Sequence, residues 1–263
     1  MINFSVRRCV LDNGYRKVAL VFVHGLGDTL MFRSYLDQLI AELTGVSIDC
    51  YVLAGFESLS LYYRSWPGWE QMPTGYDKVF EIAFFMAENS GLTKGELCGR
   101  DELGLDSWMC DLKPVVPEKS CLAAVHFSAT ALPQQCNPSE PVARRIWEIL
   151  SERGLIPIEV HSEHYFHNPV NMKYGFVNAT LRGSAPSLDK LRSVISQSMV
   201  FVGVASGPMI MALAIDHRRV IYLKRSFDIS SYTHLPVHQL GVDPFEEHRF
   251  VGYLDEILGQ EFL

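Results

Sequence analysis

The sequence predicts an α/β fold made of two Rossmann-like domains, each built around a parallel β-sheet. Strand-like and helix-like segments alternate along the chain, and the first of them form a β-α-β unit within residues 18–53. The alternation stops at a stretch with prolines at 114 and 117, which disfavour helix and central strand, and then restarts. We therefore expect an N-terminal domain over residues 1–112 and a C-terminal domain over residues 113–263.

The first half of the chain begins with an apolar strand over residues 18–24. A helix is expected over about residues 29–43, because apolar residues recur there near helical spacing. A second strand follows over residues 46–53. An aromatic, turn-rich excursion comes next, and then another apolar element that begins at Lys78.

The second half repeats the alternation. Gly154 is placed to end one of its helices, and Ser187 to begin another. The expected strands cover residues 121–129, 155–162, 199–206 and 219–224. The expected helices cover residues 139–154, 187–198 and 207–215, and an amphipathic helix within 243–263 ends the chain.

Composition narrows the function classes. The chain has 263 residues, 48% of them hydrophobic, which is enough for a large core. Its net charge of −7 predicts no general affinity for nucleic acid or anionic membranes. None of the six cysteines forms a C-x-x-C pair, and their scatter suits free thiols in the cytoplasm. We see no signal peptide and no apolar run of about 18 residues, so no transmembrane segment is expected.

The stretch VALVFVHGLGDTLMF, residues 18–32, allows two interpretations. His24-Gly25 after a strand is typical of the oxyanion loop of α/β-hydrolase esterases. That class also needs a serine in a G-x-S-x-G elbow, and the chain has none. Ser128 and Ser206 are near misses: His126 stands where the elbow needs a small residue, and Pro208 follows the second serine. The other interpretation is a glycine turn that presents Asp28 as a catalytic carboxylate.

Residues 196–224 support the second interpretation. The order Phe201-Val202-Gly203, then Ala205-Ser206-Gly207-Pro208, resembles the C-terminal half of glycosyltransferase family 9, the heptosyltransferase type. Gly25-Leu26-Gly27-Asp28 resembles that family's first loop, and residues 75–85 and 123–130 resemble two further family segments. The resemblance implies a GT-B fold whose C-terminal helix crosses back to the first domain. It also implies inverting transfer of a sugar from a nucleotide-diphosphate donor to a glycan, lipid-linked or other hydroxyl acceptor, without a metal or other cofactor.

The resemblance assigns roles to particular residues. Asp28 takes the position of the general base. The turn at Ser206-Gly207-Pro208 opens a helix, whose free N–H groups and positive end suit a diphosphate. The expected donor-binding residues are Ser128, Thr130, His161, Ser206, Gly207, Pro208 and Lys224. The expected acceptor-side residues are Gly25, Gly27, Tyr63 and Trp66.

Plainer interpretations remain beside these. Asp28 and Ser206 are also good helix N-caps, and the aromatic excursion around Tyr63 and Trp66 can cover a core. His161, His164 and His167 suit nucleotide contact, a metal site or a solvated loop. The family's Asp and His are Ala205 and Ile210 here, which favours a non-catalytic nucleotide- or sugar-binding relative as an alternative. Lys224 or Arg225 is placed to compensate for the missing phosphate-side groups.

Overall fold

The structure is a computed structural model of the chain, and it describes residues 6–82, 112, 119–129, 133–160, 188–226 and 237–259. The chain divides into two compact units, with the main boundary between Cys110 and Asp111. Leu112 belongs to the second unit: it is buried, and its backbone N–H donates to the Ala214 carbonyl at 2.7 Å. Residues 113–118 of the expected linker lie outside the described residues.

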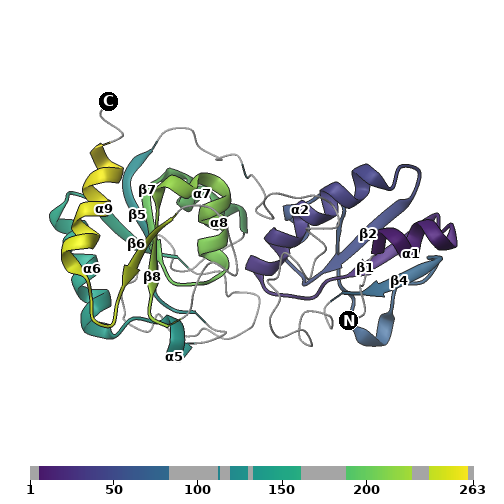
Figure 1. Ribbon diagram of the computed structural model, residues 1–263, viewed down its shortest axis with the longest axis horizontal. Coiled ribbons are helices and arrows are strands. Elements are labelled where there is room, and N and C mark those ends of the chain that lie inside the picture. The colour runs from purple at the N-terminus through teal and green to yellow at the C-terminus, as the bar shows by residue number, and fades with distance from the viewer. Residues whose placement is uncertain are drawn as a thin grey trace. The chain divides into compact units, whose positions relative to one another are not determined.

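The first unit contains a four-stranded parallel sheet with the order β3-β2-β1-β4 (Figure 1). The chain runs outward from β1 to β3 and then returns to the other side of β1 for β4. The strands are β1 (Lys17–Val21), β2 (Ser47–Val52), β3 (Tyr63–Ser65) and β4 (Lys78–Glu81). The helices are α1 (Val6–Asn13) and α2 (Leu26–Glu42), with short 3₁₀ turns η1 (Glu57–Leu59) and η2 (Trp69–Gln71).

One face of this sheet packs against α2. Alternate residues of β2, from Ile48 to Val52, are buried, as expected for a strand with one core-facing side. Tyr63 shares that face because it pairs in register with Cys50. Its hydroxyl donates to the Thr29 carbonyl of α2 at 2.7 Å, which ties the edge strand to the helix.

The opposite face is covered by the segment between β3 and β4. The Tyr76 hydroxyl donates to Asp49 Oδ2 at 2.8 Å and lies 3.0 Å from the Tyr51 hydroxyl. The Trp66 ring meets the Tyr51 ring edge-on, with centroids 6.2 Å apart. These contacts favour the interpretation in which the aromatic excursion covers the core of the first unit.

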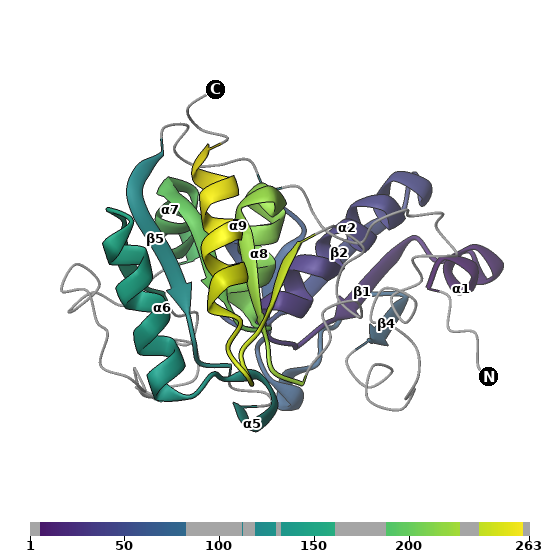
Figure 2. The ribbon, with the colours of Figure 1, turned by 60° about the vertical axis from the view of Figure 1, so that its left-hand side comes forward.

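The second unit contains a five-stranded parallel sheet with the order β6-β5-β7-β8-β9. Figure 1 labels β5, β6, β7 and β8, and Figure 2 shows this unit from another side, with β5 labelled. The strands are β5 (Ser120–His126), β6 (Ile156–Glu159), β7 (Ser198–Gly203), β8 (Val220–Lys224) and β9 (His238–Gly241). The helices are α5 (Pro133–Cys136), α6 (Glu140–Glu152), α7 (Leu188–Gln197), α8 (Gly207–Asp216) and α9 (Glu247–Gly259), with the 3₁₀ turn η5 (His217–Arg219).

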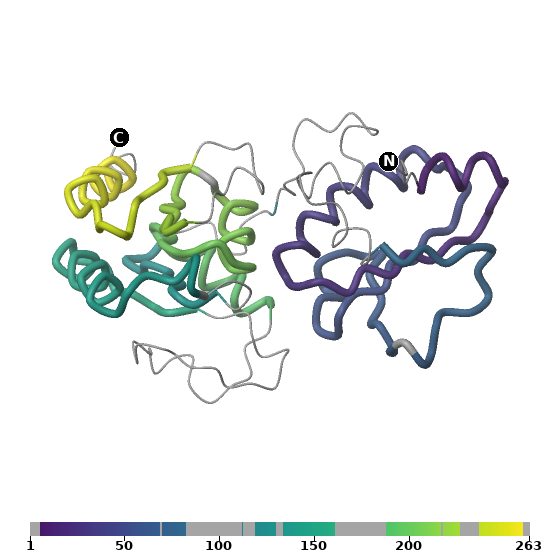
Figure 3. Tube along the Cα trace, turned by 60° about the horizontal axis from the view of Figure 1, so that its bottom comes forward, coloured from purple at the N-terminus to yellow at the C-terminus, as the bar shows by residue number. Residues whose placement is uncertain are grey.

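This sheet lies between two helix layers. Helices α6 and α9 lie side by side on one face, and α7 and α8 pack together against the sheet from the other (Figures 1 and 3). The core under α6 and α9 joins residues such as Val125, Ile146 and Phe250, which are all fully buried. Arg145 of α6 also pairs with Glu247 of α9, with 2.7 Å between Nη2 and Oε1.

The predicted fold class, two Rossmann-like units with parallel sheets, is confirmed. The C-terminal helix, which was expected to cross back to the first domain, packs with its buried face on the second unit. The buried residues of α9, Phe250, Leu254 and Ile257, complete the core of the second unit. Because those side chains need an apolar surface, and this sheet face offers one beside α6, α9 remains on the second unit.

Other details also differ from the prediction, among them the edge strand β3 and the short helix α5, which were not expected. Helix α2 begins at Leu26, three residues before the expected Thr29, so Gly27 and Asp28 lie inside its first turn. The short helix α1 and the edge strand β9 were not expected. Only two residues of α1 are buried, and His238–Gly241 has little apolar periodicity; β9 forms because it pairs in parallel with β8.

Candidate functional site

In the first unit, β1 leads into α2 at the carboxyl edge of the sheet. The sheet order places this turn where the chain switches from one side of β1 to the other. Ligands of open parallel sheets bind at such switch points, outside the carboxyl ends of the strands. Gly25 is the N-cap of α2, with an extended backbone and no side-chain cap, and Thr29 N–H donates to its carbonyl at 3.0 Å. Asp28 is therefore not the N-cap that the plainer interpretation allowed.

Asp28 lies beside His24 at this turn. Its Oδ2 atom is 3.8 Å from His24 Nδ1, and the two side chains are 17% and 25% exposed. A carboxylate in the first turn of a helix is favoured by the positive end of the helix dipole. Among the described residues, no atom would lie within 4 Å of a Cβ atom on Gly25, so they leave space beside the turn. This arrangement gives a partly buried carboxylate next to room for another molecule.

The two expected acceptor-side aromatics differ in position. Tyr63 is only 3% exposed and is bonded to α2, so its ring belongs to the core. Its expected acceptor contact does not fit this placement, because a buried ring has no free face for a sugar. Trp66 is partly exposed and follows β3, at the same carboxyl edge as the turn after β1.

In the second unit, β7 leads into α8 at the corresponding switch point, between β5 and β7. Ser206 caps α8: its Oγ accepts from Met209 N–H at 3.4 Å and donates to the Val204 carbonyl at 3.0 Å. The helix begins at Gly207, so Pro208 is its second residue. Both residues lie in the first turn, as expected for a helix terminus that could hold an anion.

Ser128 follows β5 at the same switch point. It is 8% exposed, and its Oγ has no hydrogen-bond partner within the part of the chain that the structure describes. Burying a hydroxyl without a partner is unfavourable unless something else satisfies it. The next residue is held firmly, because Ala129 N–H donates to Asn137 Oδ1 at 2.7 Å. A ligand oxygen at this edge would give the Ser128 hydroxyl its missing partner.

The two candidate elbow serines lack the geometry of a hydrolase nucleophile. Ser206 is engaged in capping, and the Ser128 Oγ atom has no hydrogen-bond partner among the described residues. The nearest histidine in the chain to Ser128 is His126, whose Nδ1 donates to the Val160 carbonyl at 2.6 Å. A serine nucleophile needs a base that takes its proton, and neither serine has a hydrogen-bonded base within the described part of the chain.

Two buried titratable residues lie close to this edge. Burial lowers the pKa of His126 to about 4, against the opposing effect of its carbonyl hydrogen bonds. Burial also raises the pKa of Glu159, the last residue of β6, to about 7. The apolar strand IPIE gave no sign of a buried carboxyl, because a strand-ending glutamate is usually solvated. Sequence reasoning therefore missed Glu159.

His126 makes stability depend on pH. Its folded pKa lies below the ordinary value of 6.5, so the unfolded chain binds more protons between pH 6.5 and about 4. Its stabilising contribution is complete above pH 6.5 and is lost as the pH falls through that window, by up to about 3 kcal/mol. Glu159 acts in the opposite sense: its contribution is lost as the pH rises from 4.5 to about 7.

Replacing His126 should isolate its share of that pH dependence. The change is His126→Asn, whose amide N–H can replace the Nδ1 donor to Val160. We expect the variant to have a lower free energy of unfolding than the wild type at every pH. Between pH 6.5 and 4, the fall in its free energy of unfolding should be smaller than that of the wild type by about 3 kcal/mol. Urea unfolding at several pH values measures this, and Glu159 is present in both proteins. Parallel curves for the two proteins would contradict the assignment.

The remaining predicted site residues divide into two groups. Lys224 ends β8 and is partly buried, one strand away from β7. Thr130, His161, His164 and His167 lie outside the described residues.

Within the described ranges, no group of three His, Cys, Asp or Glu side chains could hold a metal ion. None of the helices described there is long and apolar enough to cross a membrane.

Comparison with known proteins shows the fold. No protein-family model and no curated protein matches the chain. A solved structure of TibC, an iron-containing dodecameric glycosyltransferase from enterotoxigenic Escherichia coli, matches with a TM-score of 0.60 at 12% identity. That match covers 86% of this chain and 62% of TibC, so this chain spans less than two thirds of that protein.

Two further solved structures come from Escherichia coli. Heptosyltransferase WaaC with ADP-2-deoxy-2-fluoro heptose matches with a TM-score of 0.53 at 15% identity, over 86% of this chain and 92% of WaaC. ADP-heptose LPS heptosyltransferase II matches with a TM-score of 0.56 at 13% identity, over 94% of this chain and all of that one. The predicted resemblance to the heptosyltransferase type of family 9 is confirmed at the level of the fold.

Proposed function

We propose that this protein is an inverting glycosyltransferase that moves a sugar from a nucleotide-diphosphate donor to an acceptor hydroxyl. One observation carries the proposal: a heptosyltransferase-like fold with a strand-to-helix turn at the switch point of each sheet. One turn bears the partly buried Asp28. The other begins α8, and the buried Ser128 hydroxyl follows the neighbouring strand β5 at the same edge of the sheet. Solved relatives in fold are heptosyltransferases, and one of them holds ADP.

The donor diphosphate would bind at the second turn. The first turn of α8 offers the backbone N–H of Gly207 and a positive helix end, which stabilise phosphate oxygens, whereas Pro208 has no N–H and the Met209 N–H already donates to Ser206 Oγ. Ser128 would donate its hydroxyl to one of them, and Lys224 would add a positive charge at the end of β8. Thr130 and His161 remain candidate donor contacts from the sequence alone. This arrangement holds a diphosphate without a metal ion.

Asp28 would act as the general base. Its carboxylate takes the proton of the acceptor hydroxyl while that oxygen forms a bond to the anomeric carbon of the sugar. The bond between that carbon and the donor phosphate oxygen breaks on the opposite face. The nucleoside diphosphate leaves with the electron pair, and the anomeric configuration inverts. The space beside Gly25 would admit the acceptor, and Gly27 and Trp66 remain candidate acceptor contacts.

A second candidate function is binding of a nucleotide sugar without turnover. Ile210, a residue of α8 that is 2% exposed, stands where the family has a histidine. Ala205 stands where the family has an aspartate. Both changes remove polar groups from the donor side. This alternative keeps the binding role of α8 and omits the role of Asp28.

The experiment that tests the proposal has two stages. Thermal shift with ADP, UDP, GDP and CDP identifies a donor nucleotide, and release of that nucleotide from its sugar esters in the presence of glycan acceptors measures transfer. Binding with acceptor-dependent release supports the transferase, whereas binding alone supports the second candidate. No binding of any nucleotide would reject both.

A further inference from the structure

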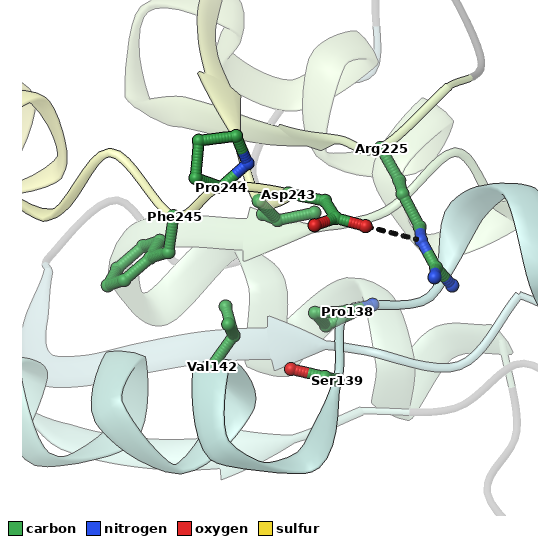
Figure 4. A pocket seen from close by; sticks show the side chains of 8 residues that line it. Pro138, Ser139, Val142, Arg225, Asp243, Pro244 and Phe245 are labelled. Carbon is green, nitrogen blue, oxygen red and sulfur yellow. Dashed lines mark ion pairs between the residues drawn. The ribbon is translucent and has the colours of Figure 1, made fainter.

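A pocket of about 180 Å³ opens at the carboxyl edge of the second sheet, away from the turn that begins α8. Figure 4 shows its lining, which comes from the start of α6, the residue after β8 and the residues after β9. The lining residues are Pro138, Ser139, Val142, Arg225, Val242, Asp243, Pro244 and Phe245. At about 30 Å³ for each water molecule, the volume corresponds to roughly six waters, which is the scale of one sugar ring.

The polar side chains of the pocket include both charges. Arg225 Nε lies 3.6 Å from Asp243 Oδ2, beyond ordinary hydrogen-bond distance, so this pair leaves hydrogen-bonding capacity on both groups. The guanidinium is oriented by its Nη1, which donates to the Gln134 carbonyl at 2.9 Å. Ser139 is exposed, and its hydroxyl makes no capping hydrogen bond to α6.

The other lining residues are apolar. In Figure 4, Phe245, Pro244 and Val142 gather towards one end of the pocket, and the Arg225–Asp243 pair lies towards the other. The pocket therefore offers an apolar surface and, beside it, a donor and an acceptor.

This combination selects among ligand classes. A purely apolar ligand would leave the charged pair without partners, and a simple anion would be repelled by Asp243. A sugar ring complements both kinds of lining residue. Its C–H face can pack on the apolar side chains, and two neighbouring hydroxyls can donate to the Asp243 carboxylate and accept from Arg225. The chemistry recognised is thus a ring that carries a vicinal diol.

We propose that this pocket binds a vicinal-diol ring of the donor, either the ribose of the nucleotide or the sugar that is transferred. The inference rests on the proposed function, which supplies a donor at the same edge of the same sheet. Arg225 directly follows Lys224, and β8 is hydrogen-bonded to β7, whose end leads into α8. The pocket gives the donor a second point of attachment beyond its diphosphate.

The test replaces Asp243 by alanine. Asp243 is 69% exposed, so Asp243→Ala should leave the fold intact. The matched control is Asp255→Ala on α9, an exposed aspartate that also pairs with an arginine, Arg153. Calorimetric titration of the full chain uses ADP, UDP, GDP and CDP, their 2′,3′-dideoxy forms and their glucose esters. A lost hydrogen bond to a charged group should weaken binding about 10- to 100-fold.

The probes distinguish the two sources of the diol. If the pocket binds ribose, Asp243→Ala weakens every probe except the dideoxy forms, which already bind the wild type weakly. If it binds the transferred sugar, only the glucose esters weaken. Equal affinities in Asp243→Ala, Asp255→Ala and wild type would overturn this inference and leave the proposed function standing. A wild type that binds no probe would overturn both.

Discussion

Substituting Gly207 by valine should abolish nucleoside-diphosphate binding while the protein stays folded. Gly207 is the first residue of α8 and has no positive φ, so valine can adopt its backbone conformation. The β-branched side chain would fill the space next to the Gly207 N–H at the start of the helix, where the diphosphate is proposed to bind. Losing the charge-assisted hydrogen bond from the Gly207 N–H corresponds to a rise in Kd of roughly 10- to 100-fold. Calorimetric titration with the nucleotide found by thermal shift measures it.

A glycine elsewhere in the second unit provides the control. Gly252 lies on the exposed side of α9, and a Cβ atom there would meet nothing within 4 Å. Gly252→Val makes the same chemical change inside a helix and should leave both folding and nucleotide affinity unchanged. If a folded Gly207→Val protein binds nucleotide like the wild type, the start of α8 is not the diphosphate site.

Substituting Asp28 by asparagine should lower the rate of sugar transfer about 10²–10⁴-fold, the usual contribution of a general base. Asparagine keeps the size of the side chain but cannot take a proton from the acceptor. The cost in stability should be small, about 0.3–1 kcal/mol, because Asp28 is not the N-cap and only its charge near the helix N-terminus is lost. Donor affinity should stay close to wild type, because the proposed donor contacts belong to the second unit.

The control for this variant lies on the same helix. Asp37 of α2 is 51% exposed and pairs with Arg33, so Asp37→Asn removes the same charge away from the turn. Initial rates of transfer, donor titration and urea unfolding for both variants separate catalysis from binding and folding. Turnover near the wild-type level in Asp28→Asn would remove Asp28 from the mechanism. Equal rate losses in the two variants would mean that the helix as a whole is responsible.

Much of the local structure could be predicted from particular residues. The apolar run at residues 18–22 and the alternation in β2 indicated strands, and Gly25 marked the turn before α2. The serine, glycine and proline at 206–208 indicated a helix start, and Gly154, with φ 77°, ends the turn after α6. These features are predictable because each depends on the side chains and backbone preferences of a few neighbouring residues.

The candidate site was only partly predictable for the same reason. Asp28 and the start of α8 follow from turn residues, but the burial of Ser128 depends on loops that meet from β5 and β7. Tyr63 was expected at the acceptor, yet its register with Cys50 turns it towards α2. The pocket beside Arg225 is lined by segments about a hundred residues apart in the chain. The sequence of one segment does not indicate which other segments lie beside it.

By itself, the sequence determined the fold class, the order of the main strands and helices, and the two turns that a ligand would meet. Only the tertiary structure decided the order of strands in each sheet, the position of α9 on the second unit and the residues that are buried at the switch points. Period and propensity fix which face of an element is apolar, but not which partner covers it. That choice depends on backbone hydrogen bonds and apolar burial between segments far apart in the chain.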